Sequence, residues 1–142
     1  MTAQVAAESL VSIEPEKYLI SPAGVELLGS QSDVTGNTFW PRRLRCPETG
    51  GTVHPVSLAS TGTIWSWTLV SFPWSGEFSA GPETGYYAAL VDLDKNGPRV
   101  VAVLLQTESR AQVGSRVQAV PLPFRTVDDH VLSILAFEEV TA

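Results

Sequence analysis

Alternation of apolar and polar residues is the main pattern along this chain, and it indicates strands rather than helices. The clearest case is residues 63–72 (TIWSWTLVSF), which are rich in β-branched and aromatic side chains, the types that favour strands. Strict alternation places Trp65, Trp67 and Leu69 on one face of this strand. Further strands are predicted wherever apolar clusters stand between turn residues, at 25–28, 38–40, 53–58, 86–93, 99–107, 114–120 and 131–140.

Turn residues divide the predicted strands. Asn96-Gly97 lies at the centre of a turn over residues 94–98, and this dipeptide is typical of a hairpin. The strand that follows, 99–107, is almost continuously apolar, which indicates burial on both faces. Pro55 shortens the strand 53–58 or places it at a sheet edge. Five or six short strands of this kind predict an all-β fold, and a closed five-stranded OB-fold barrel is the simplest arrangement.

Two segments outside the strands stand apart. The loop 73–85 contains two prolines and three glycines, and a loop of that length in a small domain is usually functional or mobile. The first residues combine small, acidic and scattered aliphatic side chains, which predict a short helix or an arm lying on a partner, with Pro15 interrupting any helix. The chain therefore divides into an N-terminal arm (1–24), a turn-rich segment (25–51) and a barrel (52–142).

The turn-rich segment contains two similar turns, SDVTG at 32–36 and CPETG at 46–50. Their spacing is that of the two CxxCG turns of a zinc ribbon, but hydroxyl side chains occupy three of the four sulfur positions. Hydroxyls are poor zinc ligands, and one thiolate cannot hold a structural zinc. We therefore expect no zinc and no other cofactor, with the segment held by turn hydrogen bonds and by packing of Phe39 and Trp40. The alternative is an ordinary polar loop between strands.

Composition restricts the class of protein. The 142 residues fit one domain, and 44% apolar with 17% charged residues is typical of a folded chain. A net charge of −6 counts against nonspecific nucleic-acid binding, which depends on neutralising phosphates. A single cysteine excludes an intramolecular disulfide. The sequence shows neither a signal peptide nor the roughly 20 apolar residues of a membrane span. We expect a cytoplasmic protein.

The order of short motifs along residues 25–140 resembles a known family. A rubredoxin-like zinc ribbon precedes a C-terminal OB-fold in that family, and the genes often lie beside those of thiolases and other acyl-CoA enzymes. The ribbon here is degenerate, because Ser32, Thr35 and Thr49 stand where the family has cysteines. The positions that match are Phe39, Pro41, Arg43, Cys46, Pro47, Gly50, Thr68, Ala89, Val91, Leu93, Gly97, Pro98, Arg99 and Gly114.

The resemblance implies a non-catalytic accessory subunit. Members of the family resemble partners of thiolase-like condensing enzymes, acyltransferases, aldolases and hydratases, on which they pack to help form the acyl-CoA channel. We expect a hetero-oligomer of this kind, with no membrane or nucleic-acid partner. The residues expected to face the catalytic subunit or CoA are Phe39, Trp40, Arg42, Arg43, Arg45, Trp65, Trp67, Pro73, Trp74 and Phe78.

Several of these residues have a second interpretation. The three arginines suit phosphate groups of CoA or an acidic patch on a partner, but they could equally pair with nearby acids such as Glu48. Trp65 and Trp67 could form an exposed interface, where tryptophan is favoured, or part of the barrel core or rim. Arginines and aromatics on an OB-fold also suit single-stranded nucleic acid. That function is the alternative hypothesis, and the acidic charge counts against it.

The sequence contains no self-sufficient set of catalytic residues. It has no G-x-S-x-G turn, glycine-rich phosphate loop or H-E-x-x-H motif. Cys46 with His54 is the one sulfur nucleophile and base that the sequence offers, and a cysteine left over from a lost metal site is the simpler interpretation. His130 follows two aspartates in a polar connector, where we expect a solvated side chain. A stand-alone enzyme is therefore the third hypothesis.

Overall fold

The computed structural model describes residues 10–71, 85–105 and 112–140. Within these ranges the chain forms strands and no helix, so it contains no helix able to cross a membrane there. The predicted all-β class is confirmed. In chain order the strands are β1 (Leu10–Ser12), β2 (Tyr18–Ser21), β3 (Gly24–Ser32), β4 (Thr38–Phe39), β5 (Val53–Leu58), β6 (Thr61–Val70), β7 (Tyr86–Leu93), β8 (Arg99–Leu105), β9 (Arg116–Val127) and β10 (His130–Glu139).

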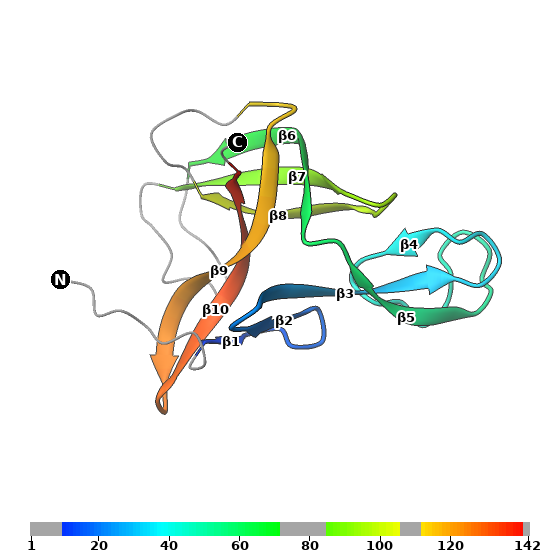
Figure 1. Cartoon of the computed structure of the whole chain (residues 1–142), viewed down its shortest axis with the longest axis horizontal. Helices are drawn as coiled ribbons and strands as arrows, with labels where there is room; N and C mark the ends of the chain where they lie inside the picture. The colour runs from blue at the N-terminus through cyan, green and yellow to red at the C-terminus, as the bar shows by residue number, and fades with distance from the viewer. Residues whose placement is uncertain (1–9, 72–84, 106–111, 141–142) are drawn as a thin grey trace.

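The larger sheet closes into a five-stranded barrel. Its strand order is β10-β8-β7-β6-β9, and β9 also pairs with β10, which joins the two ends (Figure 1). Four of the five barrel contacts are antiparallel, and three of these join strands that follow one another in the chain, whereas β10 pairs with β8 in parallel. Strand β1 extends this sheet by pairing in parallel with β10, from Leu10 opposite Val131 to Ser12 opposite Ser133.

The smaller sheet is built on β3. Strands β2 and β4 pair with successive parts of one edge of β3, and β5 pairs along the other edge. Pro55 therefore lies in an edge strand of this sheet, as the sequence predicted. Beyond the barrel, the far end of β3, with β4, β5 and the two turns at 32–36 and 46–50, extends to one side (Figure 1). We call this part the ribbon lobe. Thr38 Oγ1 donates to the carbonyl oxygen of Asn96 (3.4 Å), linking the lobe to the β7–β8 turn.

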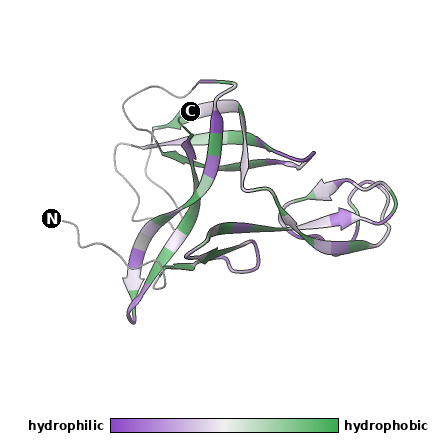
Figure 2. Cartoon of the chain, in the orientation of Figure 1, coloured by the Kyte–Doolittle hydropathy of each residue, from purple (hydrophilic) through white to green (hydrophobic). Residues whose placement is uncertain are grey.

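One hydrophobic core serves both sheets. Hydrophobic and hydrophilic segments alternate along β9 (Figure 2), as expected when one face of a strand lines a barrel. The core combines barrel residues with side chains from β2 and β3, so the two sheets fold as one unit. Its buried members are Tyr18, Val25, Leu27, Ile64, Ala89, Val91, Leu93, Val100, Leu104, Val117, Ala119, Leu135 and Phe137.

The segment 10–21 differs from the expected helix or arm, because it forms β1 and β2. Tyr18 is 1% exposed, and its hydroxyl donates to the carbonyl oxygen of Ser133 at 3.1 Å. Three or four residues are too few for periodicity to distinguish a strand from a helix. The conformation of β1 is set by pairing with β10, which lies about 120 residues later, and β2 forms a hairpin with β3, which follows it directly.

The predicted faces of two barrel strands are also corrected. A β-bulge between Ile64 and Ser66 changes the phase of β6, so Trp65 and Trp67 do not share a face. Trp65 is 50% exposed, whereas Trp67 packs against the core. Strand β8 is not buried on both faces, since Val101 is 58% exposed while Val100 is buried. A bulge inserts one residue into a strand, which reverses the alternation beyond it.

Candidate functional site

The two turns of the ribbon lobe have the same backbone structure. The carbonyl oxygens of Ser32 and Cys46 accept hydrogen bonds from the N–H groups of Gly36 and Gly50, at 3.0 and 2.8 Å. The N–H groups of Ser32 and Cys46 each donate to the carbonyl five residues later, at 2.8 and 2.9 Å. Both glycines have positive φ, +77° and +73°, a conformation that glycine adopts without strain. The two turns are therefore structurally equivalent, residue by residue.

Hydroxyl side chains stabilise these turns. Ser32 Oγ accepts hydrogen bonds from the N–H groups of Val34 (3.2 Å) and Thr35 (3.1 Å). The hydroxyls of Thr35 and Thr49 each accept from the N–H group two residues later, at 3.2 and 3.1 Å. Short polar side chains commonly satisfy turn N–H groups in this way. This agrees with the expectation that turn hydrogen bonds hold the segment.

Cys46 occupies the place in the second turn that Ser32 occupies in the first. Its thiol is buried, and it is bonded to the hydroxyls of Thr49 and Ser32 and to the backbone of Glu48 and Thr49. The Thr49 hydroxyl is the largest cause that lowers the pKa of this thiol, and burial opposes it, leaving a pKa of about 7. The contacts with Ser32 and Thr49 bring one residue of the first turn against two of the second.

These side chains do not fit a zinc ion. The four equivalent positions supply one thiol and three hydroxyls, and the hydroxyl oxygens already accept backbone N–H groups. Structural zinc sites use four thiolate or imidazole ligands. Among the described residues, no group of three or more His, Cys, Asp or Glu side chains could hold a metal ion.

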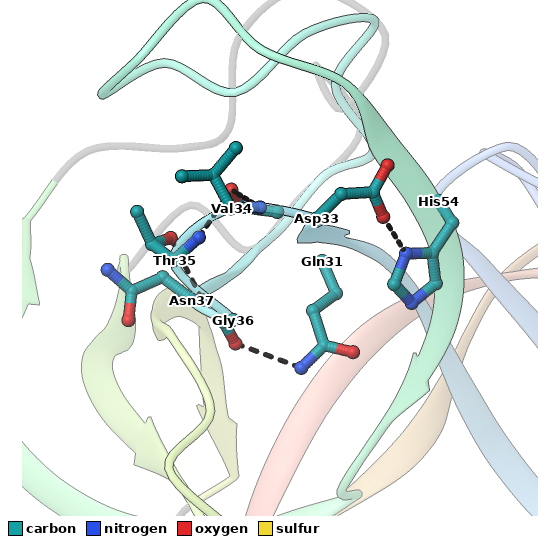
Figure 3. A network of polar contacts seen from close by, with 8 residues as sticks. Gln31, Asp33, Val34, Thr35, Gly36, Asn37 and His54 are labelled. Atoms are coloured by element: carbon teal, nitrogen blue, oxygen red, sulfur yellow. Dashed lines mark hydrogen bonds and ion pairs between the residues drawn. The ribbon is translucent and has the colours of Figure 1, made fainter.

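Neither histidine is among the hydrogen-bond partners of the Cys46 thiol. His54 Nδ1 lies 2.6 Å from Asp33 Oδ1 (Figure 3). The pKa of Asp33 is lowered chiefly by a hydrogen bond from the Thr52 side chain, and the hydrogen bond from His54 lowers it further. The partners of the Cys46 thiol are instead hydroxyls and backbone groups. His130 is exposed at the turn between β9 and β10. The structure therefore does not assemble either predicted catalytic arrangement.

Three arginines and a leucine form an exposed segment, residues 42–45, which we call the arginine segment. Arg42, Arg43 and Arg45 are exposed, and Leu44 is 98% exposed. None of the three arginines forms an ion pair with an acidic residue in the described parts of the chain. Glu48, the acid expected to pair with them, accepts a hydrogen bond from the Asn37 amide instead. The salt-bridge interpretation of the cluster is therefore not supported.

The backbone around the arginine segment is anchored to β3. Ser30 is buried, and its Oγ accepts the N–H of Arg43 at 2.7 Å. Arg42 Nε donates to the carbonyl of Gly29, and Arg45 Nη1 donates to that of Gly50, both at 3.3 Å. Arg42 and Arg45 therefore bond to neutral carbonyls, and no carboxylate among the residues that the structure describes pairs with any of the three guanidinium groups. The lobe thus presents a cationic surface around one exposed apolar side chain.

The predicted aromatic residues are divided between core and surface. Trp40 packs against the core, and its Nε1 donates to the Lys17 carbonyl at 2.8 Å. Trp67 is half-buried, with its ring centroid 5.6 Å from that of Tyr87. Trp65 lies at the surface beneath the Arg99 guanidinium, 3.7 Å from its ring centroid. Phe39 is half-buried in β4. Pro73, Trp74 and Phe78 lie outside the described residues.

The structure also contains a pocket that sequence reasoning missed. It has a volume of about 370 Å³ and lies where the segment after β1, the barrel and the base of the ribbon lobe meet. Only Trp40 among its residues was a predicted site residue, because the lining comes from five separated segments of the chain. The lining residues are Glu14, Tyr18, Trp40, Tyr86, Ala88, Val101, Ala102, Val103, Ile134 and Leu135.

Comparison with known proteins identifies the barrel. Residues 55–121 match the family model described as the ChsH2 C-terminal OB-fold domain. The barrel is an OB-fold. This confirms the predicted fold class and supports the predicted family resemblance over the OB-fold, while the match includes only residues 55–58 of the ribbon lobe. No curated protein matches the chain.

Two solved structures share this OB-fold architecture. One is titled "Ltp2-ChsH2(DUF35) aldolase"; it is 23% identical, covers 82% of this chain and 86% of its own, and has a TM-score of 0.62. The other is a protein of unknown function from the DUF35 family of Sulfolobus solfataricus; it is 18% identical, covers 81% of this chain and 76% of its own, and has a TM-score of 0.50. At these identities the comparison establishes the fold.

Proposed function

We propose that this chain is a non-catalytic accessory subunit of a larger, thiolase-like enzyme that processes acyl-CoA substrates. The OB-fold match and the similarity to a structure titled as an Ltp2-ChsH2 aldolase support this proposal. The catalytic side chains would come from the partner, since the described residues bring together neither a nucleophile with a base nor a set of metal ligands. The chain would act in the cytoplasm and without zinc.

The arginine segment is the observation that carries the proposal. Leu44 is 98% exposed between Arg43 and Arg45, although the chain as a whole carries a net charge of −6. Protein interfaces favour an apolar anchor and arginine, and complementary charge selects the partner. The matching surface would have a hollow for Leu44 surrounded by carboxylates. If CoA lies in the same interface, its phosphates would meet the same guanidinium groups.

Binding to the catalytic subunit tests this function. Co-expression with a thiolase-like or aldolase-type protein encoded nearby should yield a complex, and the affinity is then measured by titration calorimetry. The paired change Arg43→Glu with Leu44→Asp should weaken binding by about 100-fold or more, since buried charge mismatches at an interface cost several kcal/mol. Arg125→Glu, an exposed charge reversal on β9 of the barrel, is the matched control and should bind like the wild type.

The same titrations separate the competing interpretations. If the isolated wild type binds free CoA and the paired variant does not, the arginine segment contacts CoA rather than acidic side chains. Equal binding by the paired variant and the control would refute the role of the segment. Failure to form a complex with any neighbouring acyl-CoA enzyme would refute the proposed function. Salt-sensitive binding of a single-stranded oligonucleotide by the isolated chain would favour the nucleic-acid hypothesis instead.

A further inference from the structure

The pocket between the OB-fold and the N-terminal strands has the chemistry of a small-ligand site. We propose that it binds the apolar part of a small molecule, a hydrocarbon chain or ring, within this chain itself. The site is separate from the arginine segment, and it requires no partner protein. Its volume of about 370 Å³ lies within the range of small-molecule pockets, roughly 300–1,000 Å³.

Three polar side chains of the pocket wall, those of Tyr18, Trp40 and Glu14, already have partners within the protein. The Tyr18 hydroxyl donates to the Ser133 carbonyl at 3.1 Å, and the indole N–H of Trp40 donates to the Lys17 carbonyl at 2.8 Å. The Glu14 carboxylate pairs with Lys17 Nζ at 2.6 Å. Since these groups have partners, a ligand gains little by offering hydrogen bonds to them. Binding would therefore depend on burial of apolar surface.

Apart from Tyr86, the remaining wall is aliphatic and partly built from small side chains. Ala88 and Ala102 leave space that a longer side chain would fill, and Ile134 and Leu135 form the buried side. Val101 lies in the lining but is 58% exposed, so it marks where the pocket meets solvent. At this boundary the Val101 side chain can contact an entering ligand without a change in the strands.

A neutral fluorescent probe tests the site on the full chain. N-phenyl-1-naphthylamine is titrated into the protein, and its emission should rise saturably with one site per chain. Val101→Asp should weaken binding by about tenfold, because a carboxylate in an apolar wall loses hydration when a ligand covers it. Val113→Asp is the matched control, since Val113 is 67% exposed and does not line the pocket. It should bind the probe like the wild type.

A second pair of variants tests the volume of the pocket. Ala88→Phe fills the space and should abolish probe binding, whereas Val113→Phe adds the same ring at an exposed position outside the lining and should preserve binding. Circular dichroism and thermal unfolding establish that each variant is folded. Competition by 1-decanol but not by naphthalene would identify a chain-shaped ligand, and the reverse would identify a ring. Unsaturable binding by the wild type, or equal loss in Val101→Asp and Val113→Asp, would overturn the proposal.

Discussion

Restoring three thiols to the ribbon lobe should create a zinc site. The perturbation is the combined change Ser32→Cys, Thr35→Cys and Thr49→Cys, which joins the new thiols to Cys46. Ser32 and Thr49 already contact the Cys46 thiol. Thr35 stands in the first turn where Thr49 stands in the second, with the same hydrogen bond to the N–H two residues later. The four sulfur atoms should therefore converge, as tetrahedral coordination by four thiolates requires.

Without metal, the triple change should lower the free energy of unfolding, and bound zinc should then raise it. Thiols are weak hydrogen-bond acceptors, so the metal-free variant loses most of four turn bonds, the two to Ser32 and one each to Thr35 and Thr49. We expect its free energy of unfolding to fall by about 1–3 kcal/mol. Free zinc at about a thousand times the dissociation constant should then add about 4 kcal/mol, or on the order of 10 °C in melting temperature.

The assay combines metal analysis with unfolding. Protein purified with a reductant and stripped with a chelator is loaded with zinc, and its metal content and urea unfolding are measured beside the wild type. The control adds Cys46→Ser to the triple change, leaving three thiols in the same lobe. One tightly held zinc per chain is expected only with four thiols. A folded triple variant that binds no more zinc than the control would refute the equivalence of the two turns.

Three further changes test the core, the buried thiol and the barrel closure. Tyr18→Phe should lower the free energy of unfolding by about 1 kcal/mol, since the Ser133 carbonyl keeps a bond from the N–H of Ile13. Burial raises the pKa of Tyr18 from 10.0 to about 12, so the wild type should also lose stability as the pH rises from 10 to 12, and the Phe variant should not; parallel curves would contradict this. The Cys46 pKa is lowered from 9.0 to about 7 in the folded chain. Between pH 7 and 9 the thiol is therefore more protonated in the unfolded chain, and the free energy of unfolding should rise with pH. Urea titrations across that range should show the rise in the wild type but not in Cys46→Ser, and equal slopes would count against the lowered pKa. Gly62→Ala would place a methyl group against the Asp92 carbonyl and should cost about 1–3 kcal/mol in thermal unfolding, whereas an unchanged melting temperature would show that β6 and β7 can separate.

The strands that the sequence predicted best are those defined by neighbouring residues. Residues 86–93 and 53–58 were predicted with the bounds that β7 and β5 have, because turn residues flank them and β-branched or aromatic side chains fill them. The OB-fold followed from the number and spacing of such strands. These signals are local, so one sequence is sufficient to detect them.

The features that the sequence could not predict depend on distant contacts. The bulge at Trp65 arises from the pairing of β6 with β7. No residue type within β6 predicts its position. Strand β1 exists because β10 offers an edge to it. The same limit applies to the site: the arginine segment was found from its composition, but the exposure of Leu44 and the pocket emerged only once separate strands were brought together.

The parallel pairing of β1 with β10 determines when the fold can be completed. Leu10 lies opposite Val131, so about 120 residues separate partners that must meet. During synthesis β1 leaves the ribosome before β10 and stays unpaired until β10 follows it. Likewise, the hydroxyl of Tyr18, the first residue of β2, can donate its hydrogen bond only after Ser133 has been synthesised. A nascent chain therefore exposes the apolar side of β1 and β2 until β10 has been synthesised, and binding partners or chaperones can contact that side before the barrel closes.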